Sequence, residues 1–233
     1  AGTGCNDPVT GLVRHASQLE CSVASLINYR DNFTGTAFDA PDLQPNKMTA
    51  QDLFLVGSLS MSDFTNLDNV GDMRDRFYLD EVASASCRTQ ATCTSHFHCV
   101  LSRIPATATI HGVDASSSLW ADVNRLWELV GPLVGVTSPA PPSRTKPLAR
   151  KRPGLIPILD TPGSIAYLQK HGISSGSYWS TILKWMQSPA VAFGIALVRG
   201  QGAGEGMSDL RVVDVLVWMS MMRPNSRCDY RPA

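Results

Sequence analysis

Apolar side chains recur at intervals of three and four residues in several segments of the chain, which is the period of an amphipathic helix. In residues 17–31, for example, Leu19, Val23, Leu26 and Ile27 share one face. Similar stripes, or residues typical of helix ends, mark the other segments expected to be helical: 48–61, 66–84, 116–131, 161–172, 175–187, 188–200 and 208–222. Because strand signals are weak, the pattern predicts an all-α fold.

Two segments lack this periodicity. Residues 83–118 are rich in Ser, Thr, Ala and Cys, which is typical of loops and short irregular pieces. Residues 136–147 contain four prolines in twelve positions, a density that predicts a loop rather than a helix. We therefore expect one compact multi-helix domain over residues 1–233, with a long irregular insert at 83–118 and a Pro-rich loop at 136–147.

Five basic side chains lie close together just after the Pro-rich segment. They are Arg144, Lys146, Arg150, Lys151 and Arg152, with no acidic residue among them. Twenty basic and twenty acidic residues balance over the whole chain, so any role with DNA or RNA depends on local clusters such as this one. A basic surface draws phosphates. The alternative is a solvated charge run whose aliphatic stems pack over apolar neighbours.

Two aspartates stand next to or inside apolar segments. Asp160 ends the apolar run 153–160 just before a predicted helix, where a carboxylate can cap free amides. Catalysis is the other interpretation, because an aspartate there could activate a water or stabilise a cationic transition state. Asp214 lies within an apolar helix and needs a partner. This partner is expected to be an arginine or a backbone group. Arg150 or Arg152 is the natural candidate, and such an ion pair would make part of the basic cluster structural.

Three segments carry a resemblance to a known family. They are FTGTAFDAPDLQPNKMTAQDLFLVGSLSM (33–61), ARKRPGLIPILD (149–160) and LRVVDVLVWM (210–219). In this order they resemble an uncharacterised, mainly actinobacterial family with an ARKRP-x-LIP segment followed by Asp and a terminal VLD-x-x-x-WM motif. That family is distantly similar to helix-hairpin-helix DNA-repair glycosylases.

This similarity implies a DNA-gripping hairpin followed by a catalytic aspartate. Asp160 matches the position of the glycosylase aspartate, and Gly131, Gly135, Lys146 and Lys151 would lie in or near the hairpin. The chain departs from the pattern in the Pro-rich segment, because prolines there should exclude the helix that leads into the hairpin and remove backbone donors for phosphate.

A cluster of potential metal ligands lies in residues 87–99. Its members are Cys87, Cys93, His96, His98 and Cys99. Four such ligands suffice for tetrahedral zinc, but the segment has no C-x2-C or H-x3-H pair and its last three candidates are crowded. A loop with incidental thiols, or a local disulfide in an oxidising compartment, is the alternative. We expect no metal or other cofactor, and these five residues are the candidates if a metal binds.

Six cysteines in 233 residues are too few for a disulfide-scaffolded protein, so we expect reduced thiols and a cytoplasmic location. No apolar run reaches the roughly 20 residues that span a bilayer, so no membrane role is expected. Three hypotheses for function remain. The chain is a nucleic-acid-associated helical protein, a non-catalytic protein-interaction module with structural arginines, or a glycosylase-like hydrolase using Asp160. Whether it is an enzyme stays open.

Overall fold

The computed structural model describes a helical protein. The described residues are 16–32, 35–59, 64, 66–87, 93–114, 116–135, 141–160, 164–170, 172 and 178–222. Within these ranges the regular structure is helical and no strand occurs, which confirms the all-α class. Contacts divide the chain into two compact units, residues 34–158 and residues 1–33 with 159–233, and the single domain stays a prediction. The unit of residues 34–158 is therefore inserted in sequence between the two segments that make up the other unit.

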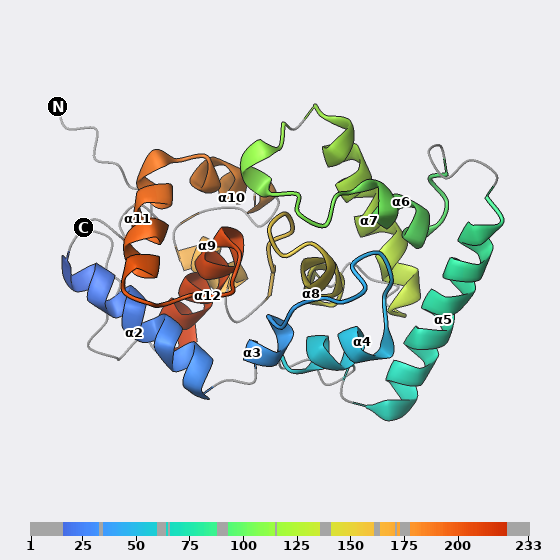
Figure 1. Ribbon diagram of the computed structural model, residues 1–233, viewed down its shortest axis with the longest axis horizontal. Helices are drawn as coiled ribbons and strands as arrows, with labels where there is room; N and C mark the ends of the chain where they lie inside the picture. The colour runs from blue at the N-terminus through green and yellow to red at the C-terminus, as the bar shows by residue number, and fades with distance from the viewer. Residues whose placement is uncertain are drawn as a thin grey trace. The chain divides into compact units, whose positions relative to one another are not determined.

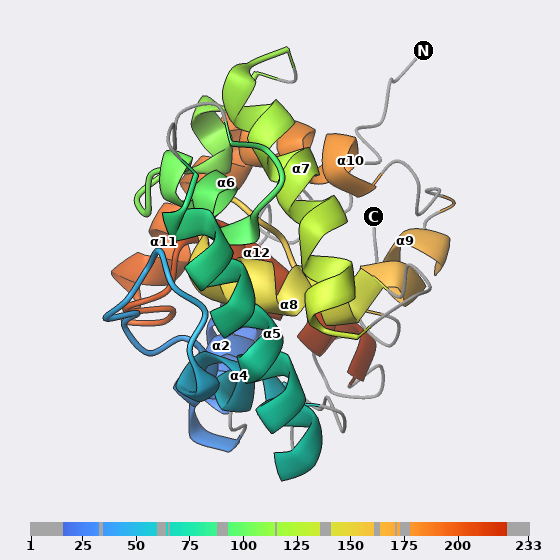
Figure 2. The same ribbon diagram turned by 90° about the vertical axis from the view of Figure 1, so that its right-hand side faces the viewer.

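The unit formed by residues 34–158 contains the helices that carry the candidate sites (Figures 1 and 2). These are α3 (Gly35–Phe38), α4 (Ala50–Gly57), α5 (Leu67–Ala85), α6 (Phe97–Arg103), the 3-10 turn η2 (Ile110–Gly112), α7 (Ser118–Leu133) and α8 (Pro141–Lys151). Helix α8 packs against α4 on one side and α7 on the other, and α5 packs against α4, α6 and α7. Buried Phe77, Phe97, Leu101 and Leu126 fill the core between them.

Helix α4 begins with a capping box, and the T-x-x-D spacing of Thr49 and Asp52 in the sequence is the pattern that predicts it. The Thr49 hydroxyl accepts from the backbone N–H of Asp52 at 3.1 Å, and the Asp52 carboxylate accepts from the Thr49 N–H at 2.9 Å. Two amides that the first helical turn leaves unpaired are thereby satisfied. The box also fixes the direction of the Asp52 carboxylate, which pairs with Arg150 and Lys151.

The prediction of a Pro-rich loop at 136–147 is wrong for residues 141–147, which lie in α8. Pro141 and Pro142 occupy the first turn, where a backbone N–H has no acceptor within the helix and proline is tolerated. Pro147 lies inside the helix and removes one hydrogen bond. Tertiary contacts of the basic residues that follow offset this loss. Residues 136–140 lie outside the described part of the chain.

The expectation of an irregular insert at 83–118 is only partly correct. Helix α5 continues to Ala85, α6 covers Phe97–Arg103 and η2 covers Ile110–Gly112. Helix α6 has no clear apolar stripe because its first five residues are all buried. A helix that is buried on every side shows no amphipathic stripe in its sequence. Residues 88–92 and 115 lie outside the described residues.

The unit formed by residues 1–33 and 159–233 is also helical. It contains α2 (Ala16–Asn32), α9 (Ala166–Lys170), α10 (Tyr178–Met186), α11 (Pro189–Gly200) and α12 (Asp209–Met222). Helix α2 packs against α11 and α12, and Arg211 on α12 donates to the Tyr29 hydroxyl at 2.7 Å. Among the described helices none alone is long and apolar enough to cross a bilayer. Only α10 and α11, taken together across a 70° bend, pass that test.

Cys21 on α2 is disulfide-bonded, so the expectation of reduced thiols is wrong for this residue. The sequence around Cys21 gave no sign of a disulfide, because the fold, and not local spacing, brings disulfide partners together. Cys87, Cys93 and Cys99 are free. The described part of the chain therefore combines the disulfide-bonded Cys21 with a group of three free thiols.

Two helical glycines should respond in opposite ways to alanine. A Cβ at Gly71 in α5 meets nothing within 4 Å, whereas at Gly131 in α7 it lies 2.6 Å from Nη2 of Arg144. Both variants gain up to about 1 kcal/mol of helix propensity. Gly131→Ala also displaces the Arg144 guanidinium from the Trp127 carbonyl and ring, which costs about 1–2 kcal/mol. In urea unfolding, the free energy of unfolding of Gly131→Ala should be lower than that of Gly71→Ala by about 1–2 kcal/mol. Equal stabilities would contradict this packing.

Candidate functional site

The basic cluster of α8 lies mostly in the interior of its unit. Relative exposure is 5% for Lys146 and Arg150, 2% for Lys151 and 0% for Arg152. A phosphate group cannot reach side chains this deeply covered without displacing their neighbours. These four residues therefore do not form an exposed basic surface, and phosphate binding by them stays a prediction. They are buried because α8 is a helix packed between α4 and α7, where the sequence predicted an exposed loop.

Asp52 is the acidic centre of this cluster. Its Oδ1 accepts from Arg150 Nε at 3.1 Å and its Oδ2 from Lys151 Nζ at 2.6 Å. Lys151 also pairs with Asp42 at 3.0 Å. Burial opposes ionisation of Asp52, but the hydrogen bonds from Lys151 and Thr49 outweigh it and lower the pKa of the carboxyl. Asp52 is therefore held as a carboxylate between two buried cations.

Arg152 has no carboxylate among its hydrogen-bond partners in the described residues. Its guanidinium donates to the backbone carbonyls of Pro45, Leu101, Ile104 and Lys151 and to Oδ1 of Asn46, at 2.6–3.0 Å. Burial lowers the pKa of Arg152 to about 10, although the Asp42 charge opposes this effect. The side chain stays charged at neutral pH and joins three distant segments of one unit.

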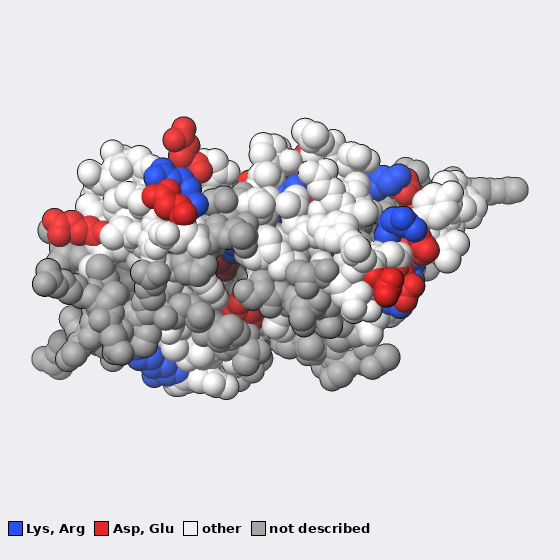
Figure 3. Space-filling view, turned by 90° about the horizontal axis from the view of Figure 1, so that it is seen from below, with Lys and Arg blue, Asp and Glu red and all other residues white. Residues whose placement is uncertain are grey.

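The remaining bonds of the cluster also go to the protein itself. Arg150 Nη1 donates to the carbonyls of Phe38, at 2.9 Å, and Ala40, and Lys146 Nζ donates to Leu59 O at 2.8 Å. On the face seen in Figure 3, basic and acidic side chains of the described residues mostly lie beside one another, without an extended basic area. These contacts are those of cations that hold the fold together.

Arg144 is half-buried and belongs to a different arrangement at the end of α7. It donates to the Trp127 carbonyl at 3.1 Å, while Arg76 from α5 donates to the Leu133 carbonyl at 3.4 Å. Gly131 and Gly135 leave room for these two guanidinium groups, and Gly135 has a φ of 76°. Cations at the carboxyl end of a helix are stabilised by its dipole. The predicted placement of both glycines in a DNA-gripping hairpin stays a prediction.

The two aspartates singled out in the sequence are both buried. Oδ1 of Asp160 accepts from the Ser164 N–H at 3.3 Å, and its carbonyl accepts from the Ile165 N–H at 2.9 Å. These bonds fit the capping interpretation, since they satisfy the start of the helical segment leading into α9. A catalytic role for Asp160 and a pair between Asp214 and Arg150 or Arg152 stay predictions.

Three of the five predicted metal candidates converge between α5 and α6. Cys87 follows the end of α5, Cys93 precedes α6, and His96 is the N-cap residue of α6. Their ligand atoms all lie within 4.8 Å of one another, and the Sγ atoms of Cys87 and Cys93 are 2.9 Å apart. Because α5 packs against α6, residues that lack conventional zinc-finger spacing come together in space.

Cys99 lies in the first turn of α6, next to the same thiols. A hydrogen bond from Cys87 lowers the pKa of Cys93 to about 6, and a bond to Cys93 raises the pKa of Cys87. Burial, followed by hydrogen bonding with Cys93, raises the pKa of Cys99 to about 12. The first negative charge in this group of thiols therefore settles on Cys93, and a thiolate is the form that binds metals.

Asp80 on α5 supports both histidines, and local sequence spacing gave no signal for it. Its carboxylate lies 3.4 Å from Nδ1 of His96 and 2.8 Å from Nδ1 of His98, and it accepts from the N–H groups of Phe97 and His98. Burial opposes ionisation of Asp80, but bonds from His98 outweigh it and lower the pKa of this carboxyl. Carboxylates in this position orient metal-binding histidines.

His98 differs from His96 in its surroundings. Its ring lies edge-on to Phe77 and Phe97, with centroids 6.3 and 5.4 Å away, and it does not belong to the converging group. Its Nε2 is buried without a hydrogen-bond partner in the described structure. Within the segment that the sequence singled out, the fold brings together Cys87, Cys93 and His96, with Cys99 beside them, and metal binding stays a prediction.

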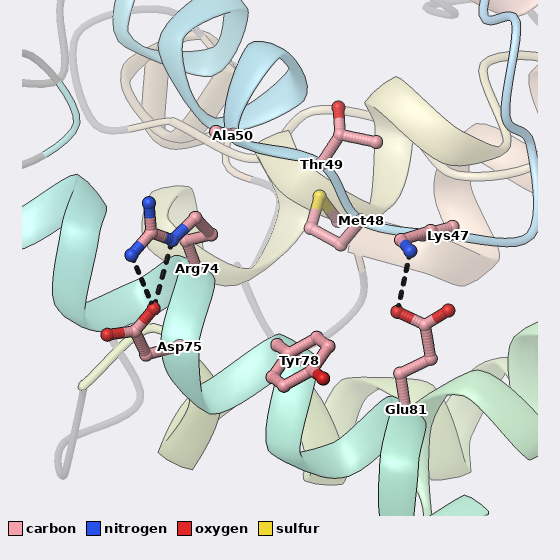
Figure 4. A pocket seen from close by; sticks show the side chains of 8 residues that line it. All are labelled: Lys47, Met48, Thr49, Ala50, Arg74, Asp75, Tyr78 and Glu81. Carbon is pink, nitrogen blue, oxygen red and sulfur yellow. Dashed lines mark hydrogen bonds and ion pairs between the residues drawn. The ribbon is translucent and has the colours of Figure 1, made fainter. Parts of the chain in front are cut away.

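A separate surface hollow of ≈ 410 Å³ lies between the start of α4 and one side of α5 (Figure 4). Its charged side chains pair with each other, Lys47 with Glu81 at 2.9 Å and Arg74 with Asp75 at 2.7 Å. The exposed ring of Tyr78 lies between these pairs along α5. Since the charges cancel, the hollow favours neither an anion nor a cation.

Comparison with known proteins gives one match. No curated protein and no solved structure matches the chain. The quoted sequence motifs, the actinobacterial origin and the similarity to helix-hairpin-helix glycosylases stay predictions. Residues 82–221, more than half of the chain, match the model of a family of unknown function (DUF6308), so the protein belongs to this uncharacterised family.

Proposed function

We propose that this protein binds one zinc ion through Cys87, Cys93 and His96, and that the metal fastens the end of α5 to the start of α6. The observation that carries the proposal is the convergence of these three ligand atoms within 4.8 Å. Two thiolates and an imidazole are soft and borderline donors of the kind that select zinc over magnesium or calcium.

Cys99 is the natural fourth ligand. It lies outside the converging group, its thiol donates to the Ser84 carbonyl at 3.8 Å, and α6 fixes its position, so a turn of this thiol toward Cys93 would complete the site. Four protein ligands make a closed tetrahedral site, which is typical of structural rather than catalytic zinc. Asp80 would hold the His96 ring in place while its other oxygen engages His98. A structural metal agrees with the hypothesis of a non-catalytic helical module.

The reduced chain should bind one zinc ion per molecule, measured by elemental analysis after gel filtration. Cobalt(II) in its place should give the absorption bands of a tetrahedral thiolate site. Cys93→Ser and His96→Ala should abolish stoichiometric binding, because each removes a direct ligand. Asp80→Asn should weaken binding about 10–100-fold, the usual effect of losing a carboxylate that orients a metal ligand.

His111→Ala is the matched control for His96→Ala. His111 lies on the exposed turn η2, outside the converging group, so its loss should leave zinc affinity unchanged. A reduced chain that binds no stoichiometric zinc would contradict the proposal. Binding that survives both Cys93→Ser and His96→Ala would place the metal elsewhere.

Nucleic-acid association through residues 144–152 and hydrolysis by Asp160 remain alternative hypotheses. The first is disfavoured because the four basic side chains with the lowest exposure are already bonded to Asp52, Asp42, Asn46 and backbone carbonyls. Salt-dependent binding would require phosphate contacts by cations that solvent does not reach. The disulfide at Cys21 is also more typical of an oxidising compartment than of the cytoplasm.

A further inference from the structure

We propose that Cys87 and Cys93 form a reversible oxidation site, at which a peroxide joins the two thiols in a disulfide and thereby releases the zinc ion. This inference rests on the proposed zinc binding, because release of the metal is the consequence that gives oxidation an effect on the fold. It adds a covalent modification and a regulator, a peroxide, to that site.

The distance between the two sulfur atoms lies between the values that the two states require. A disulfide needs about 2.05 Å between sulfurs. Two thiolates on tetrahedral zinc, each about 2.3 Å from the metal, lie about 3.8 Å apart. The Sγ atoms of Cys87 and Cys93 are 2.9 Å apart, so a change of less than about 1 Å reaches either state. The same pair can therefore close into a disulfide or open around a metal.

Exposure and bonding distinguish this pair from the third thiol. Cys87 is half-buried and open to a small oxidant, whereas Cys99 is 3% exposed and its thiol points to the Ser84 carbonyl at 3.8 Å. Cys93 lies directly beside Cys87, so once either sulfur of this pair is oxidised, the other can resolve it before it reacts further.

The reaction is balanced with hydrogen peroxide as the oxidant. The thiolate of one cysteine of the pair attacks one peroxide oxygen, the O–O bond breaks, and sulfenic acid and hydroxide form. The thiolate of the other cysteine then attacks the oxidised sulfur, the S–O bond breaks, and a second hydroxide leaves. Two protons from solvent convert both hydroxides to water. The two sulfurs lose two electrons, which the peroxide oxygens accept, and the zinc ion loses two of its ligands.

The decisive experiment treats the zinc-loaded full chain with hydrogen peroxide. Released zinc is measured with a chromogenic chelator, free thiols are alkylated, and the disulfides are identified by mass spectrometry of unreduced peptides. The expected result is one zinc ion released for each Cys87–Cys93 disulfide formed, with recovery of zinc binding after reduction by a dithiol. Peptide mapping separates this bond from the disulfide already present at Cys21.

Two variants keep the outcomes apart. His96→Ala keeps both thiols but lacks a metal ligand, so it should form the disulfide with peroxide without releasing stoichiometric zinc. Cys99→Ser should still form the Cys87–Cys93 bond. If the chain binds zinc but keeps it under peroxide, or links Cys99 instead, the oxidation proposal is overturned and zinc binding stands. If the reduced chain binds no zinc, the proposed function fails and this inference fails with it.

Discussion

Replacement of Asp52 by alanine should lower the free energy of unfolding by about 3–5 kcal/mol, the usual loss when one partner of a buried ion pair is removed. The carboxylate has two cationic partners, Arg150 and Lys151, and relative exposure of the three residues is 2–5%. Without it, Arg150 keeps only backbone carbonyls and Lys151 keeps Asp42 and the Gln44 carbonyl. Urea unfolding followed by circular dichroism measures the loss.

Thr49→Ala separates the ion pairs from the helix cap. It removes the hydroxyl that bonds to the Asp52 amide but leaves the carboxylate, so it should cost only about 1 kcal/mol. The folded-state pKa of Asp52 is lowered, so its contribution is complete above its unfolded pKa and is lost as pH falls through the folded value. The deficit of the Asp52→Ala variant should therefore shrink in acid. Equal losses in both variants, unchanged by pH, would show that the ion pairs add nothing.

Arg152→Met should be comparably destabilising, by about 3–5 kcal/mol. Methionine fills much of the volume but donates no hydrogen bond, so it leaves four carbonyls and the Asn46 side chain without their partner. Removing a buried cation relieves its desolvation, which offsets part of this loss. Arg152→Lys keeps the charge with fewer donors, so its free energy of unfolding should lie between those of the original chain and Arg152→Met. The measurement is again the urea midpoint and slope.

Arg74→Met provides the matched control. Arg74 pairs with the neighbouring Asp75, and both side chains are more than half exposed, so the change should stay within about 0.5 kcal/mol. If Arg152→Met were as stable as the original chain, the hydrogen bonds of the buried guanidinium would contribute no net stability. That result would contradict the role proposed here for Arg152.

The sequence was sufficient for features that depend on local patterns. The capping box at Thr49, the helical class and the candidate ligands in residues 87–99 all follow from spacing within a few residues. The sequence was not sufficient where contacts between distant residues determine the local structure. The prolines of α8 predicted a loop because their local cost is visible, whereas the ion pairs with Asp52, 98 and 99 residues away, are not.

The same limit applies to the burial of the basic cluster. A run of cations normally indicates a solvated surface, and only the tertiary structure shows that Asp42, Asp52 and backbone carbonyls enclose it. Asp80 was missed for a related reason. It lies seven residues before Cys87 on a charged helix, and nothing in that helix distinguishes it from its exposed acidic neighbours until α6 packs against it.

The separation between Asp52 and its cations has a consequence for synthesis of the chain on the ribosome. Helix α4 emerges first, and its carboxylate has no counter-charge until about a hundred further residues have been made. Contacts this distant in sequence slow folding, because a long loop must close before they form. The unit of residues 34–158 should therefore complete its fold only after Arg152 has left the exit tunnel, and a chain stalled before α8 would expose a helix whose buried face carries an uncompensated negative charge.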